Sequence, residues 1–375
     1  MAALSPFCWV TAPLLTAGVL IGSAQPTAVT QAPAKPFVAW CVDRAALAPA
    51  TAHTVTQLLA IAGTQDCAEA NIFFTEATSL VLERLELQDL APLSSLTQLR
   101  WLSLSTNQIE DIGALRSLTN LEHLFLDSNS VADLSPLSSL TRLQTLALYD
   151  NAITEIAPLA SLTRLQTLSL FNNQIETLTP LADLSRLTTL ALHNNRVTSL
   201  EPLNGLTRLE YLALGNNQIT DLRPLQNLTQ LQTLYLFDND IQDLTPLARL
   251  NELRALSLGN NPIQTIAPLH ALTQLEELLL FNTQIADITP LTELGQLTWL
   301  DLYNLPVADV DGLKALVNLS WLDLRGTAIR DRTCPVVPES VCLFSPSVNP
   351  TQQELQVRRS QFSRWFKRES QPVEC

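Results

Sequence analysis

Leucines recur in this chain with a strict spacing of 22 residues. Twelve consecutive frames of this length cover residues 77–340, and the fourth and sixth positions of every frame are Leu, beginning with Leu80 and Leu82. Most of the positions between the regularly spaced aliphatic residues are polar or small. Self-similarity at a fixed period of this size indicates a solenoid in which each repeat forms one coil.

The first part of each frame reads Leu-x-x-Leu-x-Leu, which has the two-residue period of a β-strand. In the third frame we therefore expect Leu124 and Leu126 to point into the core and His123, Phe125 and Asp127 to point outward. A single coil buries too few side chains to offset the entropy lost when its backbone is ordered. The coils must therefore stack and share a core and strand hydrogen bonds.

Three further columns describe the turns. Eight coils carry Asn at the ninth position, which predicts an inward ladder of amides that bond turn backbone groups. Nine coils place Pro directly before the Leu at position seventeen, which predicts short 3₁₀ turns and extended chain on the outer face. The acidic column at position thirteen is interpreted as a solvated, turn-stabilising edge; it comprises Asp89, Asp111, Asp133, Glu155, Asp221, Asp243, Asp287 and Asp309.

The complete pattern, Leu-x-x-Leu-x-Leu-x-x-Asn-x-Ile-x-Asp-Ile-x-Pro-Leu, resembles the 22-residue leucine-rich repeat of internalins and of the nuclear regulatory subunit of protein phosphatase one. The twelve frames comprise 264 of the 375 residues. The resemblance implies an α/β horseshoe with a parallel sheet on the concave face and 3₁₀ or extended segments on the convex face. Function in such families depends on residues outside the motif.

The residues before the repeats predict three segments. Residues 1–24 contain an apolar stretch at 7–21 and end in Gly22-Ser23-Ala24, which is typical of an export signal. Because a basic start is missing and Pro13 interrupts the stretch, an uncleaved membrane anchor stays open as the alternative. Residues 25–36 read as a flexible linker. Residues 37–76 are expected to form an N-terminal cap.

The N-terminal cap should contain a helix at residues 50–62. Its apolar face would cover the first coil with Val55, Leu58, Leu59 and Ile61.

The repeats are expected to end within the twelfth frame, at residue 333. Arg332, Pro335 and Pro338 occupy positions where the frame requires apolar residues. Residues 334–375 are assigned to a C-terminal cap followed by a basic amphipathic tail at 352–368. We expect the tail to dock on the protein itself, with contact to an anionic membrane as the alternative.

Four cysteines lie where a solenoid must be sealed. Cys41 and Cys67 belong to the N-terminal cap, and Cys334 and Cys342 flank the end of the repeats. Their positions predict one disulfide in each cap, with four free thiols in a cytosolic protein as the alternative. No His lies beside them, so metal binding is disfavoured. Cys375 would remain as an odd cysteine whose role the sequence does not define.

The outward strand positions three, five and seven carry the main functional signal. These 36 positions hold 11 of the 21 aromatic residues of the chain. Such a stripe predicts a partner-binding face, because aromatic anchors dominate protein interfaces. Stacking of the rings between rungs for stability alone, or stacking against carbohydrate, are the alternatives. The aromatic candidates are Trp101, Phe125, Tyr149, Phe171, Tyr211, Tyr235, Phe237, Phe281, Trp299, Tyr303 and Trp321.

The same columns contain acidic residues and small residues. The acidic candidates for partner contact are Asp127, Glu277, Asp301 and Asp323; Glu83 also lies in these columns, where the only cation is Arg325. This charge predicts a neutral or basic partner. Gly215 and Gly259 are expected to leave shallow gaps beside Phe237 that could receive a partner's side chain.

Composition and motif content argue against other functions. A net charge of −14 and a pI of about 4.7 disfavour nucleic-acid binding. The four histidines lie far apart, one in the expected N-terminal cap and three in different coils, and no phosphate-binding glycine loop or zinc motif occurs. Asp238 and Asp240 lack the loop of a calcium site. We expect no enzyme activity, no cofactor and no metal.

The function expected from the sequence is an exported, monomeric recognition module that binds a protein partner. An intracellular scaffold that regulates a bound enzyme, such as a phosphatase, is the alternative, and it would have reduced cysteines. A carbohydrate-binding surface protein is a third alternative.

Overall fold

Thirteen parallel strands form one open sheet. The computed structural model describes residues 35–344, and the strands pair in chain order from β1 to β13. From β1 to β12, neighbouring strands are in register at the repeat offset, as with Leu80 opposite Leu102, whereas Leu322 of β12 lies opposite Cys342 of β13. The strands are β1 (Ser79–Val81), β2 (Trp101–Ser103), β3 (His123–Phe125), β4 (Thr145–Ala147), β5 (Thr167–Ser169), β6 (Thr189–Ala191), β7 (Tyr211–Ala213), β8 (Thr233–Tyr235), β9 (Ala255–Ser257), β10 (Glu277–Leu279), β11 (Trp299–Asp301), β12 (Trp321–Asp323) and β13 (Cys342–Leu343).

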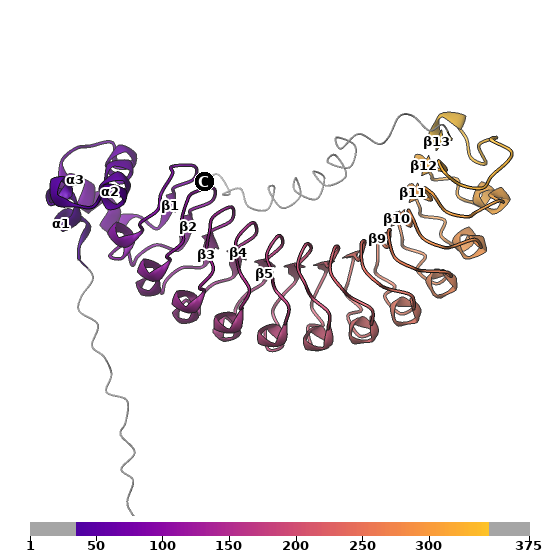
Figure 1. Ribbon diagram of the computed structural model, residues 1–375, viewed down its shortest axis with the longest axis horizontal. Coiled ribbons are helices and arrows are strands. Elements are labelled where there is room, and N and C mark those ends of the chain that lie inside the picture. Colours follow the sequence, from indigo (N-terminus) through magenta and orange to yellow (C-terminus); the bar gives the residue numbers. More distant parts are fainter. Residues whose placement is uncertain (1–34, 345–375) are drawn as a thin grey trace, which may run out of the picture. The chain divides into compact units, whose positions relative to one another are not determined.

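Short 3₁₀ turns form the outer side of the coils, and the strands line the inner side (Figure 1). Most of the turns contain a Pro at the start, such as Pro136 and Pro246, because its fixed dihedral suits a turn and an N–H at this position would have no partner within the turn. The predicted α/β solenoid is confirmed. The turns are η2 (Ala91–Leu93), η3 (Gly113–Ser117), η4 (Ser135–Ser139), η5 (Ala157–Ser161), η6 (Thr179–Leu181), η7 (Glu201–Leu203), η8 (Arg223–Leu225), η9 (Thr245–Leu247), η10 (Ala267–Leu269), η11 (Thr289–Glu293) and η12 (Asp311–Ala315).

The aspartates at position thirteen stabilise these turns. The Asp133 carboxylate accepts a hydrogen bond from the backbone N–H of Ser135 at 2.8 Å, and Asp287 accepts one from Thr289 at 2.9 Å. The backbone and hydroxyl donors of Ser135 favour the charged carboxylate and lower the pKa of Asp133. The column therefore has the structural role expected from the sequence.

The core consists of stacked leucines and a ladder of asparagines. All Leu side chains at positions four and six are buried. The amide of Asn217 donates to the carbonyl oxygens of Leu192 at 3.1 Å and Leu214 at 2.9 Å. Its Oδ1 accepts from the backbone N–H of Val197 at 2.9 Å. Each Asn of the ladder thus joins its own coil to the preceding one, as predicted.

The eighth position of every coil has a left-handed backbone, which the sequence reasoning missed. Its φ angle is between 53° and 59° at the non-Gly residues and 73° at Gly326. Asn and Asp tolerate this region better than most residues. Their side chains form a second ladder at the ends of the strands, in which Asn216 donates to Asn194 at 2.9 Å and Asn282 donates to Asn260 at 2.7 Å.

The N-terminal cap contains three helices, of which the sequence predicted only the second. They are α1 (Phe37–Val42), α2 (Pro49–Ala62) and α3 (Cys67–Glu76), with the short turn η1 (Arg44–Ala46). Val55, Leu58 and Leu59 are buried as expected, but Ile61 is 37% exposed, so the prediction that it covers the first coil is wrong. The hydroxyl of Thr54 and the ring of His53 bond backbone carbonyls of Asp89 and Leu85 at 2.7 Å, which joins α2 to the first coil.

The disulfide Cys41–Cys67 connects α1 to α3, and Cys334–Cys342 connects the incomplete twelfth coil to β13. Both predicted disulfides are confirmed. The turn η13 (Glu339–Val341) leads into β13, which pairs with β12 and covers the last complete strand. Within residues 35–344, no helix is long and apolar enough to cross a membrane. The expected signal, most of the linker, the basic tail and Cys375 lie outside the described residues.

Candidate functional site

Outward side chains on β2 and β3 and just after β4, β5 and β6 form a first ring cluster. It consists of Trp101, His123, Phe125, Tyr149, Phe171 and His193. The rings of Tyr149 and Phe171 stack with centroids 4.3 Å apart and an interplanar angle of 9°, and His193 stacks on Phe171 at the same distance. Trp101 contacts His123 at 4.8 Å and Phe125 at 4.9 Å. Both histidines occupy the same outward columns as the aromatics, but the sequence did not lead us to include either among the candidates for partner contact.

A second ring cluster extends over the coils of β7 to β12, with some rings on the strands and others two residues after a strand ends. It consists of Tyr211, Tyr235, Phe237, Phe281, Trp299, Tyr303 and Trp321. Trp299 and Trp321 stack with centroids 4.2 Å apart, whereas Tyr211 and Tyr235 meet edge to face at 5.9 Å. The guanidinium of Arg325 lies 5.7 Å from the Tyr303 ring. Ring stacking between rungs, one of the alternatives drawn from the sequence, therefore does occur.

The ring clusters nevertheless retain accessible surface. Every predicted aromatic is partly exposed except Phe125, which is 4% exposed beneath its neighbours. Tyr211 and Tyr235 are sufficiently covered for burial to raise the pKa of both hydroxyls. Several of the rings are thus positioned by contact with each other and remain half-buried on the concave side.

The acidic contribution to this face is smaller than expected. Asp301 and Asp323 have 0% relative exposure. Asp323 is paired with Arg325 through an Oδ2–Nη2 contact of 2.6 Å, and Asp301 accepts from the Tyr303 backbone at 3.0 Å. Both carboxylates are engaged inside the last coils and have no surface for partner contact, so their assignment to that role is corrected.

Asp127 and Glu277 lie between core and solvent. Asp127 is 6% exposed and accepts a hydrogen bond from the Ser105 hydroxyl at 2.7 Å. Burial raises the pKa of Asp127, although hydrogen bonds from Ser105 and Tyr149 oppose this shift. Burial also raises the pKa of Glu277. Glu277 therefore remains a candidate for contact, whereas Asp127 chiefly orients Tyr149.

The expected gaps at the glycines are already filled. A Cβ atom on Gly215 would lie 2.4 Å from the ring of Phe237, and one on Gly259 would lie 2.3 Å from the ring of Phe281. Each Phe leans over the glycine of the preceding coil. The prediction that these glycines leave room for a partner's side chain is wrong.

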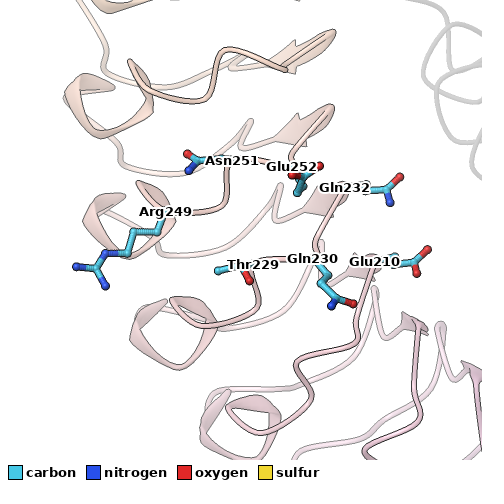
Figure 2. Close-up of a pocket in the computed structure, with 7 residues that line it drawn as sticks. All are labelled: Glu210, Thr229, Gln230, Gln232, Arg249, Asn251 and Glu252. Carbon is cyan, nitrogen blue, oxygen red and sulfur yellow. The ribbon is translucent and has the colours of Figure 1, made fainter.

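A polar depression of about 510 Å³ lies on the edge of the solenoid where coils lead into β8 and β9. Figure 2 shows that Gln230 and Glu252 extend from the loops before these strands, whereas Arg249 extends from the outer turn in a different direction. Its lining contains no His or Cys; it consists of Glu210, Thr229, Gln230, Gln232, Arg249, Asn251 and Glu252. In the part of the chain that the structure describes, no three His, Cys, Asp or Glu residues are grouped to hold a metal ion.

Comparison with known proteins agrees with this architecture. The family model for leucine-rich repeats (2 copies) matches residues 97–139, 141–183, 185–227, 207–249, 229–269 and 251–293. No curated protein sequence matches the chain.

Solved structures give a more specific relationship. An internalin from Listeria monocytogenes, InlF, is 30% identical, with 80% of this chain and 95% of that chain covered and a TM-score of 0.69. The functional domain of InlJ from the same species is 21% identical over 80% of this chain and 77% of that one, with a TM-score of 0.54. The plant peptide hormone receptor RGFR1, solved in complex with RGF2, is 21% identical, with 66% of this chain and 48% of that chain covered and a TM-score of 0.56.

A single sheet of parallel strands with 3₁₀ turns and a repeated Asn ladder defines the class of leucine-rich repeat proteins. The family model covers more than half of the chain, and the InlF comparison spans nearly all of that relative, so the chain belongs to this family and is internalin-like.

Proposed function

We propose that this protein is an exported, non-catalytic recognition module whose concave face binds a protein partner. The observation that carries the proposal is the pair of ring clusters, which position partly exposed aromatic side chains along the concave face. Preorganised aromatic side chains contribute strongly to protein interfaces because they lose little conformational entropy on binding. Internalin-like membership supports a recognition role.

The stacking geometry favours a protein over a carbohydrate ligand. Sugar rings bind aromatic side chains through exposed ring faces. In the Tyr149, Phe171 and His193 stack and in the Trp299 and Trp321 pair, the faces contact neighbouring rings at 4.2 to 4.3 Å. Rings whose faces are engaged in this way suit the side chains of a protein partner better.

The disulfides in both caps support export rather than the intracellular scaffold. Such bonds persist in oxidising compartments and are rare in the cytosol. The scaffold alternative requires reduced cysteines. Mass spectrometry of the native protein under non-reducing conditions tests this part directly, since recovery of the four cysteines as free thiols would contradict export.

The binding face is tested with matched Phe substitutions. Phe171 lies in the first ring cluster, whereas Phe73 is 46% exposed on α3, away from the strands. A photo-reactive residue placed at Tyr235 should cross-link the partner in the native organism. Phe171→Ala should then weaken binding of the captured protein by about 2 kcal/mol, and Phe73→Ala should leave it unchanged. Equal effects of both substitutions would contradict binding at the concave face.

A further inference from the structure

A column of four arginines lies at the last position of four consecutive frames, just before strands β4 to β7. It consists of Arg142, Arg164, Arg186 and Arg208, and we call it the arginine row. All four side chains are exposed. The row is notable in a chain with a net charge of −14 and 22 basic residues in total.

The arginine row lies among neutral hydrogen-bonding side chains. The preceding position of the same frames holds Thr141, Thr163, Ser185 and Thr207, and the position two residues after each of the first three arginines holds Gln144, Gln166 and Thr188. Arg142 donates to the Asn120 amide oxygen at 2.7 Å. Arg164, Arg186 and Arg208 form no ion pair with any carboxylate of residues 35–344. Their charge is therefore not neutralised by the described part of the protein.

Acidic side chains limit the arginine row at both ends. Asn120 occupies the position of the row in the coil before Arg142, and Glu122 follows it by two residues. Glu122 forms an ion pair with Arg100 at 3.4 Å. At the other end the column continues with Gln230 and Glu252, which border the edge depression together with Glu210 (Figure 2). The positive surface is consequently four coils long. Three rung intervals of about 4.8 Å give it a length of at least roughly 14 Å.

We propose that the arginine row binds a short acidic segment of a polypeptide in an extended conformation. A guanidinium presents a planar set of donors that matches a carboxylate, and repetition once per coil suits a ligand with repeated carboxylates. An extended peptide of about five residues spans roughly 16 Å, which is long enough to cover the row of roughly 14 Å. A long polyanion would extend onto the glutamates at either end and be repelled by the net negative charge.

The test uses a fluorescein-labelled, end-blocked pentaglutamate peptide, with a pentaserine peptide as the neutral comparison. Anisotropy at about 20 mM salt should show binding of pentaglutamate only, since exposed charges interact most strongly at low ionic strength. Replacing the four arginines of the row by Gln should weaken this binding at least about tenfold. The matched control variant carries Gln at four exposed arginines outside the row, namely Arg84, Arg116, Arg249 and Arg330, and should change the affinity by less than about twofold.

A second variant with Lys at the four row positions keeps the charge but lacks the planar donor set, and it should bind with intermediate affinity. Several results would overturn the proposal: no binding of pentaglutamate to the wild type, equal weakening in the control variant, or tighter binding of heparin oligosaccharide or duplex DNA than of the peptide. The Phe171→Ala variant should bind pentaglutamate normally, so failure here is distinguishable from failure of the concave-face proposal.

Discussion

Asn239 provides a quantitative test of the amide ladder. It is 6% exposed, and its Nδ2 donates to the carbonyl oxygens of Leu214 and Leu236, both at 3.0 Å. Its Oδ1 accepts from the backbone N–H of Ile219 at 3.0 Å. Asn239→Ala removes these three bonds, together with a longer one from Nδ2 to the Phe237 carbonyl oxygen at 3.2 Å, and leaves the backbone groups of the three shorter bonds, in two adjacent coils, without this partner. At about 1 to 1.5 kcal/mol for each group, the free energy of unfolding should fall by about 3 to 5 kcal/mol.

The tenth frame contains a natural control at the same position. Thr283 is 5% exposed and makes one such bond, from its hydroxyl to the Leu280 carbonyl at 2.8 Å. Thr283→Val keeps the shape of the side chain and removes that bond, so it should cost about 1 kcal/mol. The eleventh frame has Leu305, whose own backbone N–H donates to the Leu302 carbonyl at 3.3 Å and so partly replaces the side chain.

Urea unfolding of both variants, followed by circular dichroism, measures the difference. The wild type and the two variants should unfold with similar dependence on urea, because the surface exposed is nearly the same. If Asn239→Ala costs no more than Thr283→Val, the backbone bonds made by the amide do not stabilise the stack. The reasoning from bond number to stability would then be refuted.

Three further predictions concern other parts of the fold. Gly215→Ala should lower the free energy of unfolding by roughly 1 to 3 kcal/mol, because the new Cβ meets the Phe237 ring. In a double-mutant cycle, this loss should shrink by about half or more in a Phe237→Ala background. Replacing Cys334 and Cys342 by Ser should increase proteolysis near β13 without unfolding the central coils, as measured by limited proteolysis with mass mapping. Unchanged cleavage near β13 would show that the bond is dispensable. Hydrogen bonds from Thr289 lower the pKa of Asp287, so the charged carboxylate stabilises the fold at pH values above its ordinary pKa, and this effect is lost as the pH falls through the lower pKa of the folded state. Asp287→Asn should therefore reduce the free energy of unfolding at about pH 6 but not at about pH 2, and an equal loss at both pH values would refute this prediction.

Much of the architecture could be predicted because the 22-residue period contains two independent structural signals. Alternation in Leu-x-x-Leu-x-Leu determines which side chains face the core, and the Pro and Asn columns determine the turn chemistry. Both disulfides followed from the positions of the cysteines at the ends of the array. By contrast, α1, α3 and β13 lie outside the repeats, where no period identifies them.

The binding face was predicted only in part. Strand alternation correctly placed the aromatic residues in the outward columns, but it carries no information about rotamers or about contacts with the next coil. Phe237 therefore fills the space above Gly215, and Asp323 is buried with Arg325, although both Phe237 and Asp323 were assigned to an open surface. Contacts of this kind depend on packing between rungs.

The sequence by itself determined the coil, its core, the inward amides and the order of the strands, because these depend on local period and on residue type. Only the tertiary structure decided which outward side chains remain accessible, since accessibility depends on neighbours one repeat away in the chain but about 4.8 Å away in space. The same stacking converts four arginines, separated by 22 residues each, into one continuous positive row. Proximity in the stack, rather than proximity in the chain, creates both surfaces through which we propose that this protein acts.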